Sequence, residues 1–233
     1  MYPFELTKEC LDAAEGNLPA KRARSLRVFQ NEFVERYLAQ AHPITPGIWF
    51  GPVIGVGLWR GESAFGAGKT AALFAGGVLL VSFVEYALHR WGFHFAANTK
   101  AERLRLFLAH GYHHAFPDDP RRLVLPPLAI WPVAAILISL WYVVFGRFFW
   151  PVLAGSATGY VAYDWVHYAT HHFRPRTPLG RWLKRYHMLH HHDLPGTRYG
   201  ITSPLWDLVF GTYLPTTSLA RREPATAKNR VKT

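Results

Sequence analysis

Long apolar stretches alternate with polar, charged stretches along the chain, and this alternation predicts helices that cross a membrane. Four stretches have the composition of membrane spans, at 41–59, 70–88, 124–145 and 148–163. The third is the strongest, because it carries no formal charge and exceeds the roughly 20 residues that a helix needs to cross about 30 Å of hydrocarbon. Gly146 and Arg147 then predict a tight break before the fourth span.

The polar stretches divide the chain into an N-terminal segment, a membrane-embedded domain and a tail. In residues 1–40, apolar side chains recur at roughly helical spacing, at Leu26, Phe29, Phe33, Val34 and Leu38. This spacing indicates an amphipathic helix that either lies on the membrane or packs against the rest of the protein. Residues 41–214 form the membrane-embedded domain, and 215–233 form a basic tail that we expect to be mobile.

The positive charge follows the four-span topology. Of the 26 Lys and Arg residues, all but Arg60, Lys69 and Arg147 fall in segments that share one side of the membrane. The positive-inside rule assigns that side to the cytoplasm, together with both termini and every histidine except His42. Topology therefore explains the net charge of +11, and no basic stripe with interleaved aromatics points to nucleic acid. The single Cys10 excludes an internal disulfide framework and a thiolate metal cluster.

Four parts of the chain carry histidines at spacings suited to metal ligation. Neutral imidazole is a strong ligand for first-row transition metals, and residues three or four apart share a helix face. The ten candidate ligands are His89, His94, His110, His113, His114, His167, His171, His187, His190 and His191. Ten imidazoles are too many for one ion, whereas two metals with about five each leave an open position for oxygen or water. We expect His42, His172 and His192 to be ordinary surface or hydrogen-bonded residues.

Neighbouring residues complete the predicted site. The first two candidate histidines are five apart and can converge only if their helix ends or bends, which Gly92 allows. Glu85 lies four residues before His89 and Asp164 three before His167, so each carboxylate can face and orient its histidine. The alternative is that both carboxylates cap or solvate helix ends at the membrane interface.

With these motifs the sequence resembles the fatty acid hydroxylase and sterol desaturase superfamily, most closely its fatty acid 2-hydroxylase branch. The resemblance covers about residues 80–214. The matching stretches are EYALHR at 85–90 with His94, HGYHHAFPDDPRRLVLPP at 110–127, Tyr163-Asp164 through His167-Tyr168 to His171-His172, YHMLHHH at 186–192, and YGITSPLWDLVFGT at 199–212.

The resemblance implies an all-α integral membrane protein with four transmembrane helices and a cytosolic helical cap that holds a dimetal site. The ten histidines would bind two iron ions, which zinc can replace in purified protein, and the enzyme would use O₂ and two electrons. Its product would be a 2-hydroxylated acyl chain, free or within a sphingolipid-type lipid. Breaking an unactivated C–H bond needs a redox-active metal–oxygen species, which side chains alone do not provide.

The sequence departs from many eukaryotic relatives in one respect. They carry a fused cytochrome b5 domain with a His-Pro-Gly-Gly motif, whereas here His42-Pro43 is followed by Ile44-Thr45. We therefore expect a separate cytochrome b5 or ferredoxin-type electron donor. The expected location is the bacterial cytoplasmic membrane or the endoplasmic reticulum, with membrane lipids and a lipid acyl substrate as partners.

Three other functions stay open at this point. The same scaffold could hydroxylate or desaturate a sterol, a carotenoid or another position of a lipid. A membrane metal transporter would usually place its ligands near the bilayer midplane, whereas these histidines lie at one boundary. A hydrolase could use metal-activated water, but ten imidazoles without an evident carboxylate base fit that chemistry less well.

Overall fold

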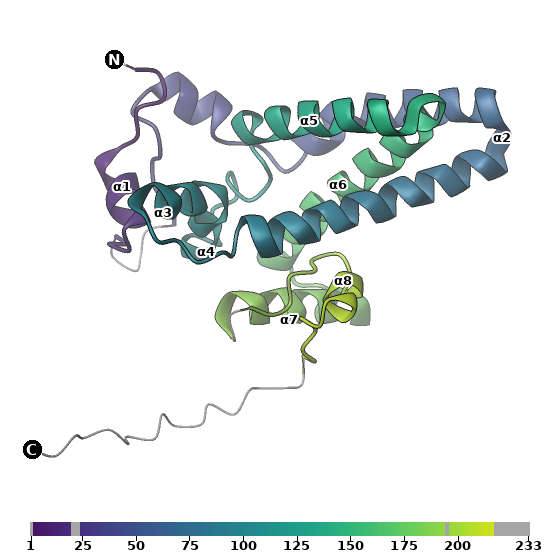
Figure 1. Cartoon of the computed structure of the whole chain (residues 1–233). Coiled ribbons are helices and arrows are strands. Elements are labelled where there is room, and N and C mark those ends of the chain that lie inside the picture. The colour runs from purple at the N-terminus through teal and green to yellow at the C-terminus, as the bar shows by residue number, and fades with distance from the viewer. Residues whose placement is uncertain (1, 20–23, 194–195, 217–233) are drawn as a thin grey trace, which may run out of the picture.

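The computed structural model of the protein describes residues 2–19, 24–193 and 196–216, and their regular structure is helical (Figure 1). In chain order the elements are α1 (Lys8–Ala14), the π-helical turn η1 (Val34–Leu38), α2 (Thr45–Ala87), π-helical η2 (Leu88–Gly92), α3 (Lys100–Leu106), π-helical η3 (Phe107–Gly111), α4 (Tyr112–Ala115), α5 (Pro127–Phe145), the 3-10 turn η4 (Gly146–Phe148), α6 (Phe149–His172), α7 (Pro178–His192) and α8 (Leu205–Val209). Most of the basic tail predicted at 215–233 lies outside the described residues.

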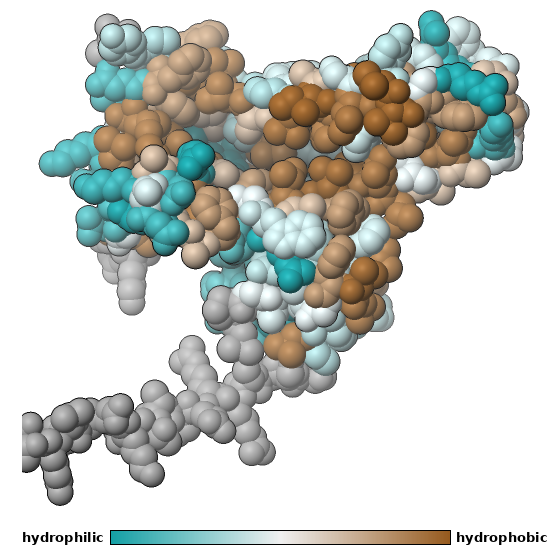
Figure 2. Space-filling model, in the orientation of Figure 1, coloured by the Kyte–Doolittle hydropathy of each residue, from teal (hydrophilic) through white to brown (hydrophobic). Residues whose placement is uncertain are grey.

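Two helical stretches, Thr45–Gly92 and Pro127–His172, are long and apolar enough to cross a membrane. Only 17% of the most apolar window of each is buried by the rest of the protein, so these are not the enclosed core helices of a soluble fold. Figure 2 shows hydrophobic side chains along this body, and hydrophilic ones gathered at its two ends. The surface therefore has the banding that a membrane-embedded body requires.

Each long stretch doubles back on itself (Figure 1). Gly66, at φ 75°, breaks α2 into two arms, and Gly146, at φ 48°, separates α5 from α6. Side chains disfavour such positive φ values, which explains glycine at both turns. The predicted break at Gly146 is confirmed, and the helix that contains most of the first predicted span, 41–59, begins at Thr45 and continues to the kink at Gly66. The helix of the fourth predicted span, α6, continues past residue 163 to His172 and so carries His167 and His171 in its last turns.

Glycines let α2 and α6 approach until their backbones touch. A Cβ atom added to Gly77 would lie 2.2 Å from the carbonyl oxygen of Val152, and one added to Gly155 would lie 2.0 Å from that of Phe74. Small residues of this kind are the usual means of close helix packing in lipid, where the hydrophobic effect does not drive helices together. The α2–α6 pair is thus the rigid spine of the body.

The N-terminal segment packs against η3 and α4, which carry three of the candidate histidines. The helix expected over 26–38 is wrong for its first part: only residues 32–38 are helical, with the π-helical turn η1 at 34–38, and Phe29 instead makes a bridge with Leu6. The Glu35 carboxylate accepts hydrogen bonds from the backbone N–H groups of Val28 (3.1 Å) and Phe29 (3.0 Å). Because these donors are satisfied by a side chain, the segment does not need helical hydrogen bonds.

A buried ion pair fixes this segment in place. Glu35 pairs with Arg122, and both side chains are about nine-tenths buried. Arg122 also donates to the carbonyl of Ala39 (2.8 Å). Since Arg122 stands just before α5, the pair ties the N-terminal segment to the base of the third helical arm.

The glycine packing yields a matched test on two adjacent positions. Gly77→Ala should lower the free energy of unfolding by about 1–3 kcal/mol, because the new methyl group forces α2 and α6 apart. Gly76→Ala meets open space and should be neutral or stabilise the helix by up to about 1 kcal/mol. Thermal unfolding of both variants in detergent measures the difference. Equal melting temperatures would show that the two helices do not pack through Gly77.

Candidate metal centre

Four parts of the chain deliver the ten candidate histidines to one end of the helical body. They are η2 and the turn after it, η3 with α4, the last turns of α6, and α7. Two of these elements are π-helical, a distortion that often marks functional sites. In η2 this geometry and the following turn bring the rings of His89 and His94 to 5.0 Å, although they are five residues apart.

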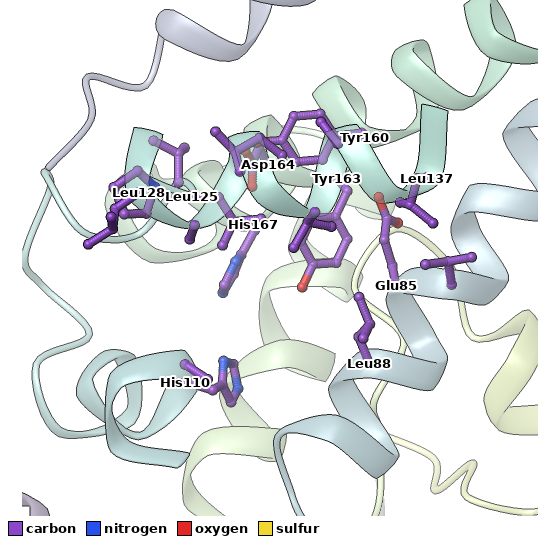
Figure 3. Close-up of a pocket in the computed structure, with 18 of the residues that line it drawn as sticks. Glu85, Leu88, His110, Leu125, Leu128, Leu137, Tyr160, Tyr163, Asp164 and His167 are labelled. Carbon is purple, nitrogen blue, oxygen red and sulfur yellow. The ribbon is translucent and has the colours of Figure 1, made fainter. Parts of the chain in front are cut away.

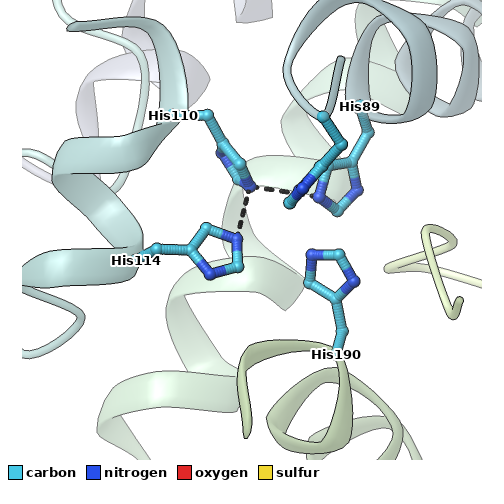
Figure 4. Close-up of side chains that lie close together, drawn as sticks. His89, His110, His114 and His190 are labelled. Atoms are coloured by element: carbon cyan, nitrogen blue, oxygen red, sulfur yellow. Dashed lines mark hydrogen bonds between the residues drawn. The ribbon is translucent and has the colours of Figure 1, made fainter. Parts of the chain in front are cut away.

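The ten histidines form two groups of five. The first group is His89, His94, His110, His114 and His190, and the second is His113, His167, His171, His187 and His191. Within each group, one nitrogen from every ring lies within 4.8 Å of all the others. Figure 4 shows rings of the first group converging on a common point from separate helices. The remaining histidines, His42, His172 and His192, stand outside both groups.

The spacing of the ring nitrogens fits a coordinated ion. Nε2 atoms of neighbouring rings lie 3.1 Å apart in the pair His89–His110 and 2.8 Å apart in the pair His171–His187. Two nitrogens bound at right angles to one ion, each about 2.1 Å away, would be separated by about 3 Å. Because an Nε2 atom carries at most one proton, hydrogen bonds alone cannot satisfy five converging nitrogens. The donor set therefore fits a first-row metal in each group.

Main-chain carbonyl groups orient two rings of the first group. His89 donates from Nδ1 to the carbonyl of Tyr199 (2.6 Å), and His190 donates from Nδ1 to that of Thr197 (3.0 Å). A carbonyl can only accept, so each ring is held with Nε2 free to face the group, the arrangement usual for metal-bound histidine. Accordingly, His190 Nε2 is buried and has no partner among the described residues.

Asp207 in α8 holds the loop that supplies these carbonyls. Its fully buried carboxylate accepts four hydrogen bonds, from the backbone N–H groups of Tyr199 (2.8 Å) and Gly200 (2.7 Å) and from the hydroxyls of Tyr186 (3.0 Å) and Thr212 (2.7 Å). The sequence offered one signal for this role, the 199–212 stretch that matches the 2-hydroxylase branch, but spacing alone assigned no function to Asp207.

Burial keeps the clustered rings neutral. It lowers the pKa of His94 to about 4, of His114 to about 3 and of His190 to about 4. It also lowers the pKa of His110 and His187 well below the ordinary value. At neutral pH each ring therefore presents a lone pair, which a metal requires.

The two carboxylates predicted to orient histidines lie in the wall of a neighbouring cavity (Figure 3). Glu85 Oε1 and Asp164 Oδ2 have no hydrogen-bond partner among the described residues. The cavity has a volume of about 570 Å³, is lined mainly by apolar side chains of α2, α5 and α6, and reaches His110, His113 and His167. An apolar chain bound there would meet both histidine groups at one end.

Comparisons with known proteins agree with this geometry. Residues 74–212 match the family model described as fatty acid hydroxylase. The chain is 36% identical over 206 residues to the Arabidopsis thaliana protein "Dihydroceramide fatty acyl 2-hydroxylase FAH1", covering 84% of this chain and 83% of that protein. It is 35% identical over 189 residues to the Saccharomyces cerevisiae "Ceramide very long chain fatty acid hydroxylase SCS7", of which it covers 48%. A solved structure of full-length Scs7p, in which only the hydroxylase domain is visible, has a TM-score of 0.78 and 29% identity, and covers 92% of this chain and 81% of that chain.

The two groups predict the metal content of the protein. We expect wild-type protein saturated with iron to hold two ions per chain. His190→Ala and His187→Ala should each lower the metal content by about one ion per chain, because the two rings belong to different groups. Elemental analysis against protein concentration measures this. His42→Ala, outside both groups, is the control. Full metal content in the His190→Ala/His187→Ala double variant would rule out these groups as the binding sites.

Asp207 gives a second, indirect test. Asp207→Ala leaves buried N–H and O–H donors unpaired, each costing about 1–3 kcal/mol, and frees the loop that orients His89 and His190. We expect a lower melting temperature and loss of metal from the first group, whereas Asp12→Ala, at an exposed site, should change neither. Retention of both ions by a folded Asp207→Ala protein would contradict the proposed positioning role.

Proposed function

The chain belongs to the fatty acid hydroxylase family, and from this membership we propose that it adds a hydroxyl group to C2 of fatty acyl chains, free or within a sphingolipid-type lipid. One observation carries the proposal, the position of two groups of five histidines, most of them buried, at the head of an apolar cavity. The named activities of the relatives favour this reaction over sterol or carotenoid oxidation and over metal transport.

We propose that the ten histidines are the ligands of two iron ions. The donor set is purely imidazole, which suits iron, zinc and other first-row metals, and only a redox-active ion supports oxidation of a C–H bond. When bound, the iron pair would supply the activation of O₂ that side chains cannot provide. The protein's own part is to hold ten neutral rings in two fixed groups and to aim their nitrogens inward.

The cavity would bind and orient the acyl chain. Its apolar walls favour a hydrocarbon, and their exclusion of water protects the reacting end from side reactions. Because C2 is adjacent to the carbonyl carbon, the polar end of the lipid must lie beside the histidines while the tail extends between the helices. The unpaired oxygens of Glu85 and Asp164 are placed to hydrogen-bond with groups at that polar end.

Membrane insertion places this site at the bilayer boundary. We propose that the four helical arms, two from α2 and one each from α5 and α6, all cross the membrane, within an embedded domain that spans 41–214. The bias of Lys and Arg assigns the histidine end and both termini to the cytoplasm. The two electrons that reduce the second oxygen atom of O₂ to water would then come from a separate cytoplasmic donor, of the cytochrome b5 or ferredoxin type.

Product analysis tests the proposed reaction. Iron-loaded protein, supplied with O₂ and a reduced ferredoxin or cytochrome b5, should convert free fatty acids or N-acyl sphingoid bases into 2-hydroxy products that mass spectrometry identifies. His190→Ala should abolish the product, because it removes a ring of the first group, whereas His42→Ala should retain it.

The same experiment separates the rival reactions. Oxygen inserted at another carbon of the chain, or a double bond formed instead of an alcohol, would refute 2-hydroxylation while keeping the oxidase chemistry. Wild-type protein with full iron content and no lipid product from any donor would refute the oxidase chemistry itself.

A further inference from the structure

We infer that Trp141 and Ser156 form the floor of the acyl cavity and thereby set the longest acyl chain that the enzyme accepts. The inference rests on the proposed function, because it assigns the cavity to the tail of the same substrate. It adds a specificity determinant at the end of the cavity farthest from the histidines.

The cavity runs deep into the helical body. Along α6 its lining extends from His167 to Leu153, which are fourteen residues apart, or about 21 Å in an α-helix. Along α5 it extends from Leu128 to Trp141, or about 20 Å. Since α5 starts at the histidine end and α6 returns to it, Trp141 and Leu153 both lie at the deep end. On the α5 side every lining residue along this path is apolar, as an acyl tail requires, and α6 adds Ser156, Tyr160 and Tyr163 to its apolar residues.

Tight packing closes the deep end. Trp141 and Leu153 belong to a buried cluster with Phe149 and Val152, and the last two do not reach the cavity. The ring of Trp141 also lies edge-on to that of Phe145, with centroids 6.0 Å apart. Beyond the indole, aromatic and aliphatic side chains therefore fill the space between the helical arms.

Hydrogen bonds fix the indole in this position. Trp141 donates from Nε1 to the hydroxyl of Ser156 (2.9 Å), which in turn donates to the carbonyl of Gly77 (3.1 Å). These contacts join α5, α6 and α2, and all three groups are in apolar surroundings where an unpaired N–H is costly. The indole cannot swing aside for a longer chain without losing its partner, so the floor is rigid.

A rigid apolar floor discriminates sharply between chain lengths, because one additional methylene in a closed hydrophobic pocket changes relative rates by about 10–200-fold. Trp141→Ala removes the indole and lengthens the cavity toward Phe145 and Phe149. Ala134→Leu, at a small residue midway along the same wall, shortens it. Ser156→Ala keeps the indole but removes the hydroxyl that accepts its hydrogen bond. This variant should broaden the range of acyl-chain lengths accepted instead of shifting it.

The test is a competition among N-acyl sphinganines of increasing saturated acyl length, with the 2-hydroxy products quantified by mass spectrometry. Trp141→Ala, and the milder Trp141→Phe, should raise the ratio of long-chain to short-chain product by about tenfold or more. Ala134→Leu should lower it. Val143→Ala is the control, because this neighbouring side chain is 79% exposed, does not line the cavity and should leave the ratio unchanged.

The outcomes distinguish this inference from the function on which it rests. Wild-type protein that makes no 2-hydroxy product sinks both proposals. If the Trp141→Phe and Ala134→Leu variants are active but keep the wild-type chain-length profile, the role of Trp141 as the cavity floor is refuted while the proposed function stands. The acyl tail would then lie elsewhere. If Trp141→Ala fails to fold, these two conservative variants still decide the matter, because their opposite shifts are required.

Discussion

Ten imidazole rings packed against one another at one end of an apolar body are the constraint on which this structure depends. Burial depresses their pKa values, so that mutual charge repulsion is avoided at neutral pH. Neutral rings with converging nitrogens cannot all satisfy one another, and His190 Nε2 has no hydrogen-bond partner among the described residues. A cation in each group would satisfy these nitrogens, and the surrounding helices hold the rings in a position to bind one.

The helical body gives this polar centre an apolar counterpart. Close contact between α2 and α6 through Gly77 and Gly155 makes a rigid pair. The cavity lies between this pair and α5. The cavity therefore has one fixed wall and one separate wall, with histidines at its head and the Trp141 indole at its base. Chemistry and substrate selection occupy opposite ends of a single channel.

The sequence allowed the candidate metal ligands to be predicted more accurately than the secondary structure. Helical spacing identified ten histidines, and the structure gathers these ten into the two groups, because three- and four-residue repeats fix which side chains share a face. It failed for 26–38, where tertiary contacts from Glu35 replaced helical hydrogen bonds. The sequence also missed Asp207, since a carboxylate that positions histidines through the main-chain carbonyls of its own loop leaves no spacing pattern to detect.

The carbonyl groups behind His89 and His190 also determine when the centre can form. His89 lies in the first half of the chain, yet its Nδ1 partner, Tyr199, is 110 residues later, and Tyr86 meets Thr212 across 126 residues. Contacts so distant in sequence form only after the intervening helices are in place. Metal binding is thereby coupled to completion of the fold. A partly folded chain cannot assemble the metal centre before the substrate cavity beside it has formed.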